Sequence, residues 1–596
     1  MPKHPEAPGK RPGGPVRPPS LRRTVRLGKA VDIWRKPAFS AAFSLAVPNL
    51  SLLAADRLDL ALYTSAGAMC ALYGHGLPYA ARARALFWVV LGMVAGLGLA
   101  LTAACWTRSA PVLVLLAALL AAVHKVVCDA TRIGPPGNLI FTFIAASAFF
   151  VPQRPAEVPG HLLLAAACGA FAWLVCMAPA AVRPHGPERI AVARALEAAA
   201  GLLRAPADAG ARHATAAAVN AAWHTLRSAP RRTGARPGRR PGAAGRGSAA
   251  RVRTGLARLL VRAESALAAE VGDPAAEAER YTGWARDLRS GRPLPRVALT
   301  AAQAAELAGV AVERAGSAPS ASPAPRQGPG RRARAGARRI AAAFAPGSPL
   351  LPVGARVAAG CALAGWVSIA AGVSRPYWAV VTAASIHQAN TSLSWQRAVQ
   401  RTLGNLLGLV VFAALLPVVH TGAAAMVLLV LACQIGAEAL ITRNYWLGSV
   451  CVTPMALLLT EFGGSHPAGE LIGARWTDTL LGAGLGLLAC CVITNRRATG
   501  RAEAALRAAE DAMAEARRTL AAPAPEPAAG PGAGPVGDRL RTSLVELREA
   551  VEVASGEWWQ PAGTQERAAA AEREGHRLLA QLVRRRPADR RAAEWG

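Results

Sequence analysis

Two charged residues interrupt an apolar stretch in the C-terminal quarter of the chain. In ARWTDTLLGAGLGLL (474–488), Arg475 and Asp478 are three residues apart, so on a helix they share one face. An ionisable side chain inside a bilayer is expensive, and its presence there indicates a function or a fixed partner. Two roles fit. The residues form a structural ion pair, or Asp478 carries a proton while Arg475 helps to hold a substrate.

A second polar group follows the apolar run 423–441. Arg443, Asn444 and Tyr445 open the next apolar run, and Glu438 lies near the end of the first. A guanidinium forms paired hydrogen bonds with a carboxylate, so Arg443 is the better candidate for binding an organic acid. A structural salt bridge is the alternative role for the charged members of this group.

The segment 374–408 places arginines between two apolar runs and then glycines at a fixed spacing. Arg397 and Arg401 either reach lipid phosphates or gather an anion at the entrance to a pathway. Gly404 and Gly408 have the spacing that lets two membrane helices approach closely. The segment therefore predicts tight helix packing next to a positive charge.

Two further side chains of the same segment carry alternatives. Trp378 is either an interfacial anchor or a face on which an aromatic substrate stacks. His387 is either a proton sensor, since histidine is the side chain suited to that role near neutral pH, or the satisfied histidine of a polar loop. The sequence does not decide between these roles.

Spanning helices are needed to position these residues. With 53% hydrophobic residues and a formal charge of +32 over 596 residues, the composition fits a membrane protein with basic extramembrane segments. One crossing takes about 20 mostly apolar residues. The sequence predicts an all-α integral membrane protein with about twelve spans. The candidate spans are 38–55, 60–77, 86–105, 111–127, 136–151, 161–180, 353–373, 376–390, 399–418, 423–441, 444–460 and 474–494.

The two sets of six apolar runs resemble each other. The stretches 61–92 and 378–408 each hold an apolar helix, a polar break with a histidine, arginines and an apolar helix with glycines. Six crossings return a chain to the same side, so this pattern predicts a parallel duplication. Arginine-rich links alternate with arginine-poor ones, and the positive-inside rule then places both termini in the cytoplasm.

Five segments follow from these patterns. They are a basic disordered cytoplasmic tail (1–36), a first six-helix half (37–182), a cytoplasmic helical and Arg-rich linker region (183–350), a second half (351–497) and a cytoplasmic helical C-terminal region (498–596). Helical patterns in the linker region cover 187–204, 211–228, 252–270 and 296–314. A flexible basic loop is expected at 231–247, and a low-complexity disordered stretch at 317–339.

The second half resembles the fusaric acid resistance (FUSC) family of bacterial membrane proteins, which belongs with the aromatic acid exporters. The resemblance covers about 350–497 and rests on three segments in order: YWAVVTAASIHQ…QRAVQRTLGNLLG, ITRNYWLGSVCVTPMALLL and ARWTDTLLGAGLGLL. It implies an inner-membrane protein with two six-helix halves and cytoplasmic domains, assembled as a homo-oligomer. Efflux of organic anions is the implied activity.

Three functions fit these features. The first is proton-driven efflux of organic, aromatic or hydrophobic anions. The second is a passive anion channel, as in the related plant malate channels. The third is a membrane-anchored scaffold whose Arg-rich linker binds a polyanion. The expected partners are the lipid bilayer and the anion. The basic loops lack interleaved aromatic residues, so no specific nucleic acid is expected. No phosphate-binding loop or H-E-x-x-H motif occurs, so we expect no enzyme activity, cofactor or metal.

Overall fold

The structure is a computed structural model in which every regular element of the described residues is a helix, as predicted. It describes residues 20–28, 34–228, 252–253, 255–260, 262–264, 266–267, 273–295, 329–462, 467–522, 534–557 and 564–584. The predicted basic loop 231–247 and the predicted helix 296–314 lie outside these residues. Most of the predicted N-terminal tail also lies outside them.

The membrane domain consists of two sets of six helices that follow one pattern of lengths. The first set is α2 (Arg35–Ala54), α3 (Ala61–Ala68), α4 (Tyr79–Trp106), α5 (Ala110–Thr131), α6 (Leu139–Phe149) and α7 (Val158–Met177). The second set is α15 (Leu351–Ala370), α16 (Tyr377–Ile386), α17 (Thr391–Val419), α18 (Ala423–Ile441), α19 (Tyr445–Glu461) and α20 (Ala468–Val492). In both sets the second and fifth helices are shorter than their neighbours.

Among the described residues, seven helices are long and apolar enough to cross a membrane, or up to eight if α20 and the bent helix after it form one span. The predicted number was twelve. The difference lies in five helices. Helices α3, α6, α16 and α19 have 8, 11, 10 and 17 residues, whereas a crossing takes about 20, and α20 counts as a span only together with the bent helix after it. A window of apolar residues does not reveal where the backbone turns. All ten residues of α16 are buried, so protein surrounds it.

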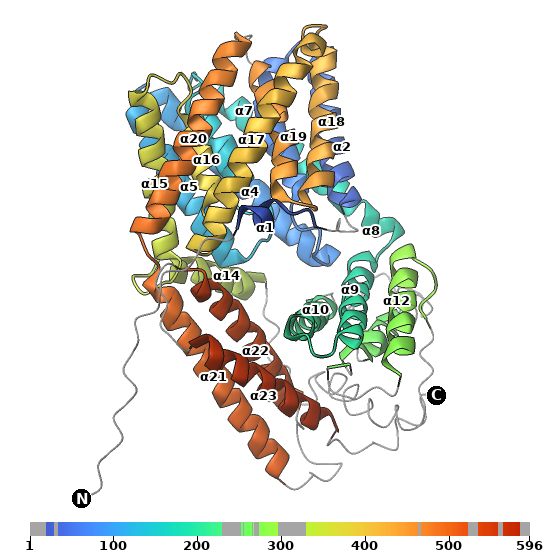
Figure 1. The fold of residues 1–596 in the computed structure, drawn as a ribbon. Helices are drawn as coiled ribbons and strands as arrows, with labels where there is room; N and C mark the ends of the chain where they lie inside the picture. The colour runs from blue at the N-terminus through green and yellow to red at the C-terminus, as the bar shows by residue number, and fades with distance from the viewer. Residues whose placement is uncertain are drawn as a thin grey trace, which may run out of the picture.

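The packing partners of one set recur in the other (Figure 1). Helix α15 packs on α5, and α2 packs on α18, so the first helix of each set lies against the fourth of the other. The short helices also meet across the two sets, α6 with α16 and α3 with α19. This exchange of equivalent partners is what a duplicated unit related by a twofold axis would produce.

Two helical domains lie at the same end of the membrane domain, which we call the domain side (Figure 1). The middle domain contains α9 (Gly186–Arg204), α10 (Ala209–Ser228) and α12 (Pro274–Ser290) around buried residues that include Trp223 and Tyr281. The C-terminal bundle contains α21 (Arg496–Ala521), α22 (Gly534–Ser555) and α23 (Thr564–Arg584). Its apolar core is separate from the other two.

Two smaller helices lie at the boundary between the membrane domain and these domains (Figure 1). Helix α14 (Pro329–Ala343) includes residues 329–339, for which disorder was the expectation. The expectation failed there because alanine and arginine, both good helix formers, dominate this part of the stretch. Helix α1 (Leu21–Val25) lies near α17.

Candidate functional site

Glycines bring four helices of the second set close together. A Cβ atom on Gly404 would lie 2.4 Å from the Ser449 Cβ atom, so α17 and α19 pack almost backbone to backbone. A Cβ atom on Gly482 would lie 2.6 Å from the Ala379 carbonyl oxygen, so α20 and α16 also pack almost backbone to backbone. The close approach predicted from the spacing of Gly404 and Gly408 is confirmed.

Arg475 of α20 is buried in this four-helix region and has only 1% of its surface exposed. Its guanidinium carbon lies 4.0 Å from the centre of the Trp378 ring on α16. Its Nε and Nη1 atoms have no hydrogen-bond partner among the described residues. A buried guanidinium normally has its donors paired, because an unpaired buried charge is costly. These two donors are therefore unusual among buried arginine donors.

Asp478 lies one turn further along α20 and is fully buried. The Ser368 hydroxyl of α15 donates a hydrogen bond of 2.6 Å to its Oδ1 atom, while Oδ2 has no partner in the described chain. No ion pair joins Asp478 to Arg475 within the described ranges, although they share a helix face. The structural ion pair was the first of the two predicted roles, and the geometry does not support it.

A second guanidinium lies beside the first. Arg401 of α17 is 3% exposed and donates a hydrogen bond of 3.2 Å to the Tyr445 hydroxyl. Its Nε atom lacks a partner in the part of the chain that the structure describes. Arg397 lies over the Tyr445 ring at 3.8 Å. Arg401 is enclosed by protein, so its predicted alternative of reaching lipid phosphates does not fit its position.

A chain of neutral polar groups ties these helices together. The Thr453 hydroxyl of α19 donates to the Asn405 side-chain oxygen at 2.9 Å. The Asn405 amide donates to Thr479 at 3.2 Å, and the Thr479 hydroxyl donates to the Arg475 carbonyl at 2.7 Å. Asn405 is not among the residues predicted from the sequence, although an asparagine inside an apolar run is itself a signal.

Trp378 and His387 have structural surroundings. Trp378 is 1% exposed and contacts Phe143 as well as Arg475, so it is no interfacial anchor. The two ring nitrogens of His387 lie 2.6 Å from the Ala383 carbonyl and 3.0 Å from the Arg356 carbonyl. A neutral imidazole has one N–H and donates to only one of these carbonyls, so both predicted roles of His387 stay predictions.

The remaining predicted residues are Asn444, Arg443 and Glu438. Asn444 caps α19 and donates to the carbonyls of Thr24 and Arg26, at 3.1 and 3.0 Å. Arg443 is exposed, and its carbonyl accepts from the Gly28 amide. Glu438 is half-buried on α18. The structure thus brings Arg475, Asp478, Trp378, Arg401, Arg397 and Tyr445 into one region of the second set.

The first set also has a buried arginine, Arg82, but its donors are paired with backbone carbonyls. Arg82 of α4 donates to the carbonyls of Gly74, His75, Leu77 and Cys176. Its role is structural, since backbone oxygens occupy its donors. Helix α7, which has the place of α20 in the first set, contains no Asp, Glu, Lys or Arg. The fold thus does not require charges at the position of Arg475 and Asp478.

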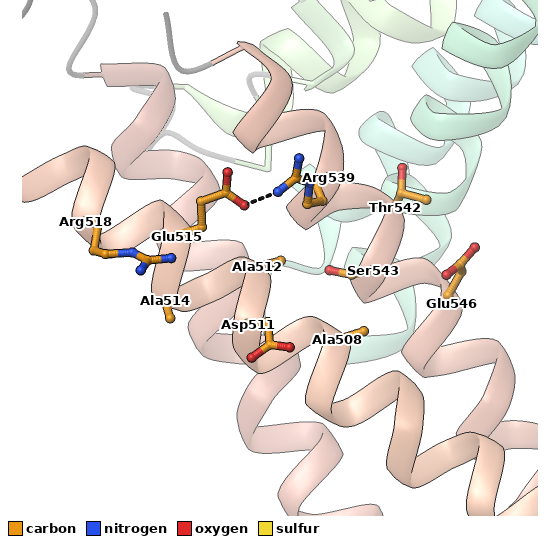
Figure 2. Close-up of a pocket in the computed structure, with 10 residues that line it drawn as sticks. All are labelled: Ala508, Asp511, Ala512, Ala514, Glu515, Arg518, Arg539, Thr542, Ser543 and Glu546. Carbon is orange, nitrogen blue, oxygen red and sulfur yellow. Dashed lines mark hydrogen bonds and ion pairs between the residues drawn. The ribbon is translucent and has the colours of Figure 1, made fainter.

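A surface groove of about 840 Å³ occurs elsewhere, between α21 and α22 of the C-terminal bundle (Figure 2). Side chains of both charges line it, and Glu515 pairs there with Arg539 at 2.5 Å. The groove contains none of the residues predicted from the sequence. Among the described residues there is also no group of three or more metal-binding side chains.

Comparisons with known proteins show what the second set of helices is similar to. Residues 361–489 match the family model described as fusaric acid resistance protein-like. The chain is 30% identical over 195 residues to the uncharacterized membrane protein YvaC of Bacillus subtilis (strain 168). That match covers 32% of this chain and 29% of the relative, so the similarity spans less than a third of the relative's length. No solved structure matches the chain. Residues 361–489 of this multi-pass membrane protein are thus similar to the fusaric acid resistance protein-like family.

Proposed function

We propose that this protein is a secondary transporter that exports organic anions, with aromatic carboxylates as the substrate class and the proton gradient as the energy source. The observation that carries the proposal is the buried Arg475 guanidinium, which has free donors and lies on the Trp378 ring. A carboxylate fits those donors, and an aromatic ring fits among neighbouring aromatic side chains.

Asp478 supplies the proton site in this proposal. Its Oδ2 atom is buried and has no partner among the described residues, and Asp478 lies one helical turn from Arg475. A buried carboxylate of this kind binds a proton or a cation when its surroundings change during transport. Anion binding at Arg475 and proton binding at Asp478 would then influence each other through their charges.

We further propose that the short helices complete the crossings that the long ones begin. Each set of six helices starts and ends on the domain side (Figure 1), which requires an even number of crossings in each set. The basic links Arg82–Arg84 and Arg397–Arg401 lie at that side, so the positive-inside rule makes it cytoplasmic. The substrate would enter from the cytoplasm near Arg397 and Arg401.

Two other functions make different predictions. A passive anion channel would use the same arginines without any proton coupling at Asp478. A scaffold would need only the basic segment 231–247, which lies outside the described residues. The buried charges of α20 favour transport over the scaffold, because a membrane anchor has no need of them.

Flux in proteoliposomes tests the proposal. The purified full chain is reconstituted, a pH gradient is imposed, and the movement of labelled benzoate and salicylate is followed. Accumulation that follows the gradient supports a proton-coupled carrier. Flux that ignores the gradient supports a channel, and the absence of flux for both compounds contradicts the proposal.

A further inference from the structure

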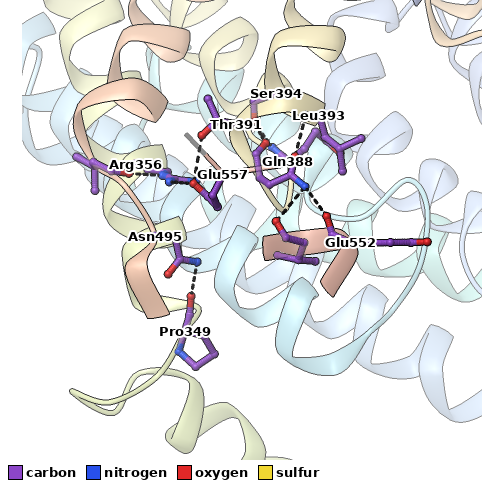
Figure 3. A network of polar contacts seen from close by, with 12 residues as sticks. Pro349, Arg356, Gln388, Thr391, Leu393, Ser394, Asn495, Glu552 and Glu557 are labelled. Carbon is purple, nitrogen blue, oxygen red and sulfur yellow. Dashed lines mark hydrogen bonds and ion pairs between the residues drawn. The ribbon is translucent and has the colours of Figure 1, made fainter. Parts of the chain in front are cut away.

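A buried ion pair joins the C-terminal bundle to the membrane domain (Figure 3). Arg356 of α15 donates to both carboxylate oxygens of Glu557, at 3.0 and 2.7 Å. The two side chains are 1% and 4% exposed. Glu557 follows directly after α22, so the end of the bundle is inserted against the membrane helices.

The same end of α22 also holds the junction between α16 and α17. The Asn390 side chain donates to the carbonyls of Glu552 and Val553, at 3.2 Å each, while its oxygen caps α17. The Thr391 hydroxyl donates to Glu557 at 3.2 Å. A Cβ atom on Gly556 would overlap the Asn390 side chain, so the fit leaves no free space.

This junction supports two of the helices that contribute to the region around Arg475, which itself lies on α20. Helix α16 ends at the junction and contains Trp378, and α17 begins there and contains Arg401. Arg401 is ten residues from Thr391, which is about 15 Å along a helix. A shift of the junction therefore moves the site, because a helix of this length transmits displacement as a rigid rod.

The ion pair is not part of the hydrophobic core of the bundle. That core is formed by residues of α21, α22 and α23 that include Leu506, Leu544 and Leu578. A buried ion pair contributes little to net stability compared with apolar packing, while loss of one partner leaves an uncompensated charge. Its function is thus better explained by attachment at a defined position than by stabilisation of the bundle.

We infer that Glu557 is a positioning residue of the anion site: through Arg356 and Thr391 it fixes the α16–α17 junction, so that the C-terminal bundle controls substrate affinity. The effect on substrate affinity rests on the proposed transport function. The positioning of the α16–α17 junction by Glu557 does not depend on that function. Any movement of the bundle that withdraws Glu557 would loosen Trp378 and Arg401 together.

The test compares the full-length wild type with Glu557→Gln, Glu557→Asp and the charge exchange Arg356→Glu with Glu557→Arg. Glu574→Gln is the matched control, since the ion pairs of Glu574 lie within the bundle, at 3.5 Å to Arg517 of α21 and 3.1 Å to Arg577 of α23. The first measurement is amide hydrogen exchange of residues 395–405 in nanodiscs without ligand. The second is the KM and the maximal rate of benzoate flux in proteoliposomes.

We expect Glu557→Gln to raise exchange in 395–405 at least tenfold and to raise the KM for benzoate several-fold, with a smaller change in the maximal rate. Glu557→Asp should have an intermediate effect, the charge exchange should restore part of it, and Glu574→Gln should resemble the wild type. Unchanged exchange in both folded Glu557 variants would overturn the inference, and so would increased exchange with an unchanged KM. Absence of benzoate flux in the wild type would contradict the proposed function, while the exchange data would still decide the positioning step.

Discussion

Asp478 and Arg475 are both buried on α20, yet each has its own surroundings. Ser368 occupies one oxygen of Asp478 and leaves the other free, and Trp378 covers one face of Arg475 while two of its nitrogens lack partners in the described chain. The residue types and their spacing were visible in the sequence. The free atoms were not, because they depend on Ser368 and Trp378, which are about 100 positions away.

The carboxamide variant Asp478→Asn removes the charge but keeps the size and the oxygen that accepts from Ser368. We expect benzoate flux to continue while accumulation driven by the pH gradient falls to the level reached without a gradient. Proteoliposome uptake with and without the gradient measures this. Ser368→Ala is the control that disturbs the same hydrogen bond without removing the charge. Full gradient-driven accumulation by Asp478→Asn would show that the proton binds elsewhere.

Arg82 provides the structural counterpart of Arg475. Substitution Arg82→Lys removes the planar fork that reaches four carbonyls. We expect a loss of about 2–4 kcal/mol in stability, the sum of a few charged hydrogen bonds, with little change in the KM for benzoate among the molecules that fold. Denaturant unfolding in detergent and flux assays measure the two quantities. A changed KM at unchanged stability would contradict this division of roles.

At the scale of elements, glycine spacing was the most reliable signal. Gly404 and Gly408 predicted a close helix contact, and the backbone of α19 lies there. The lengths of the helices were less predictable. Apolar windows reach across the polar breaks near His75 and His387, and so they merged short buried helices with their flanking loops.

The α17–α19 contact predicts a specific difference between two glycines. An alanine at 404 would place its Cβ atom 2.5 Å from the Trp446 carbonyl oxygen, whereas Gly484 has nothing within 4 Å. We expect Gly404→Ala to lower stability by about 1–3 kcal/mol, the typical cost of overpacking. Gly484→Ala should be neutral or slightly stabilising. Thermal unfolding of the two variants tests this, and equal melting temperatures would contradict the packing described for α17 and α19.

Asn444 predicts a second effect at this scale. The variant Asn444→Asp keeps the oxygen that caps α19 but loses the donors that hold the carbonyls of Thr24 and Arg26. We expect trypsin to cleave next to Arg22 or Arg26 several-fold faster, while the melting temperature changes little. Gln400 and Trp446 also donate to this segment, which limits the effect. An unchanged cleavage rate would show that those two contacts suffice.

At the scale of the whole molecule, two helical domains lie on one side of the membrane domain. The contacts among these three parts come from residues far apart in the sequence. Arg356 and Glu557 are 201 positions apart, and Arg541 pairs with Glu264 between the bundle and the middle domain. No pattern in the neighbouring sequence identifies residues that pair between domains, since an arginine or glutamate in a polar helix is usually solvated. The sequence therefore indicated separate helical segments, but not how they are joined.

The bundle should respond to acid through His576. Burial, together with the charges of Arg212, His213 and Arg541, lowers the pKa of His576 from 6.5 to about 4. The unfolded bundle therefore binds a proton more readily than the folded one, and stability falls as the pH decreases from about 6.5 to 4. The maximal contribution is about 3 kcal/mol for a shift of this size.

Hydrogen exchange of α23 at several pH values checks this expectation. Protection should decrease below pH 6.5 in the wild type and much less in His576→Gln, which cannot gain the charge. Equal pH dependence in the two proteins would show that other groups control the acid response of the bundle.

Equilibrium binding of labelled benzoate to the purified full chain is the most direct test of the central claim that Arg475 binds the anion. We predict saturable binding by the wild type and at least a tenfold weaker affinity in Arg475→Gln. The melting temperature should stay the same or rise, because an unpaired buried charge has been removed. Equal affinity of the wild type and Arg475→Gln for benzoate would contradict the account.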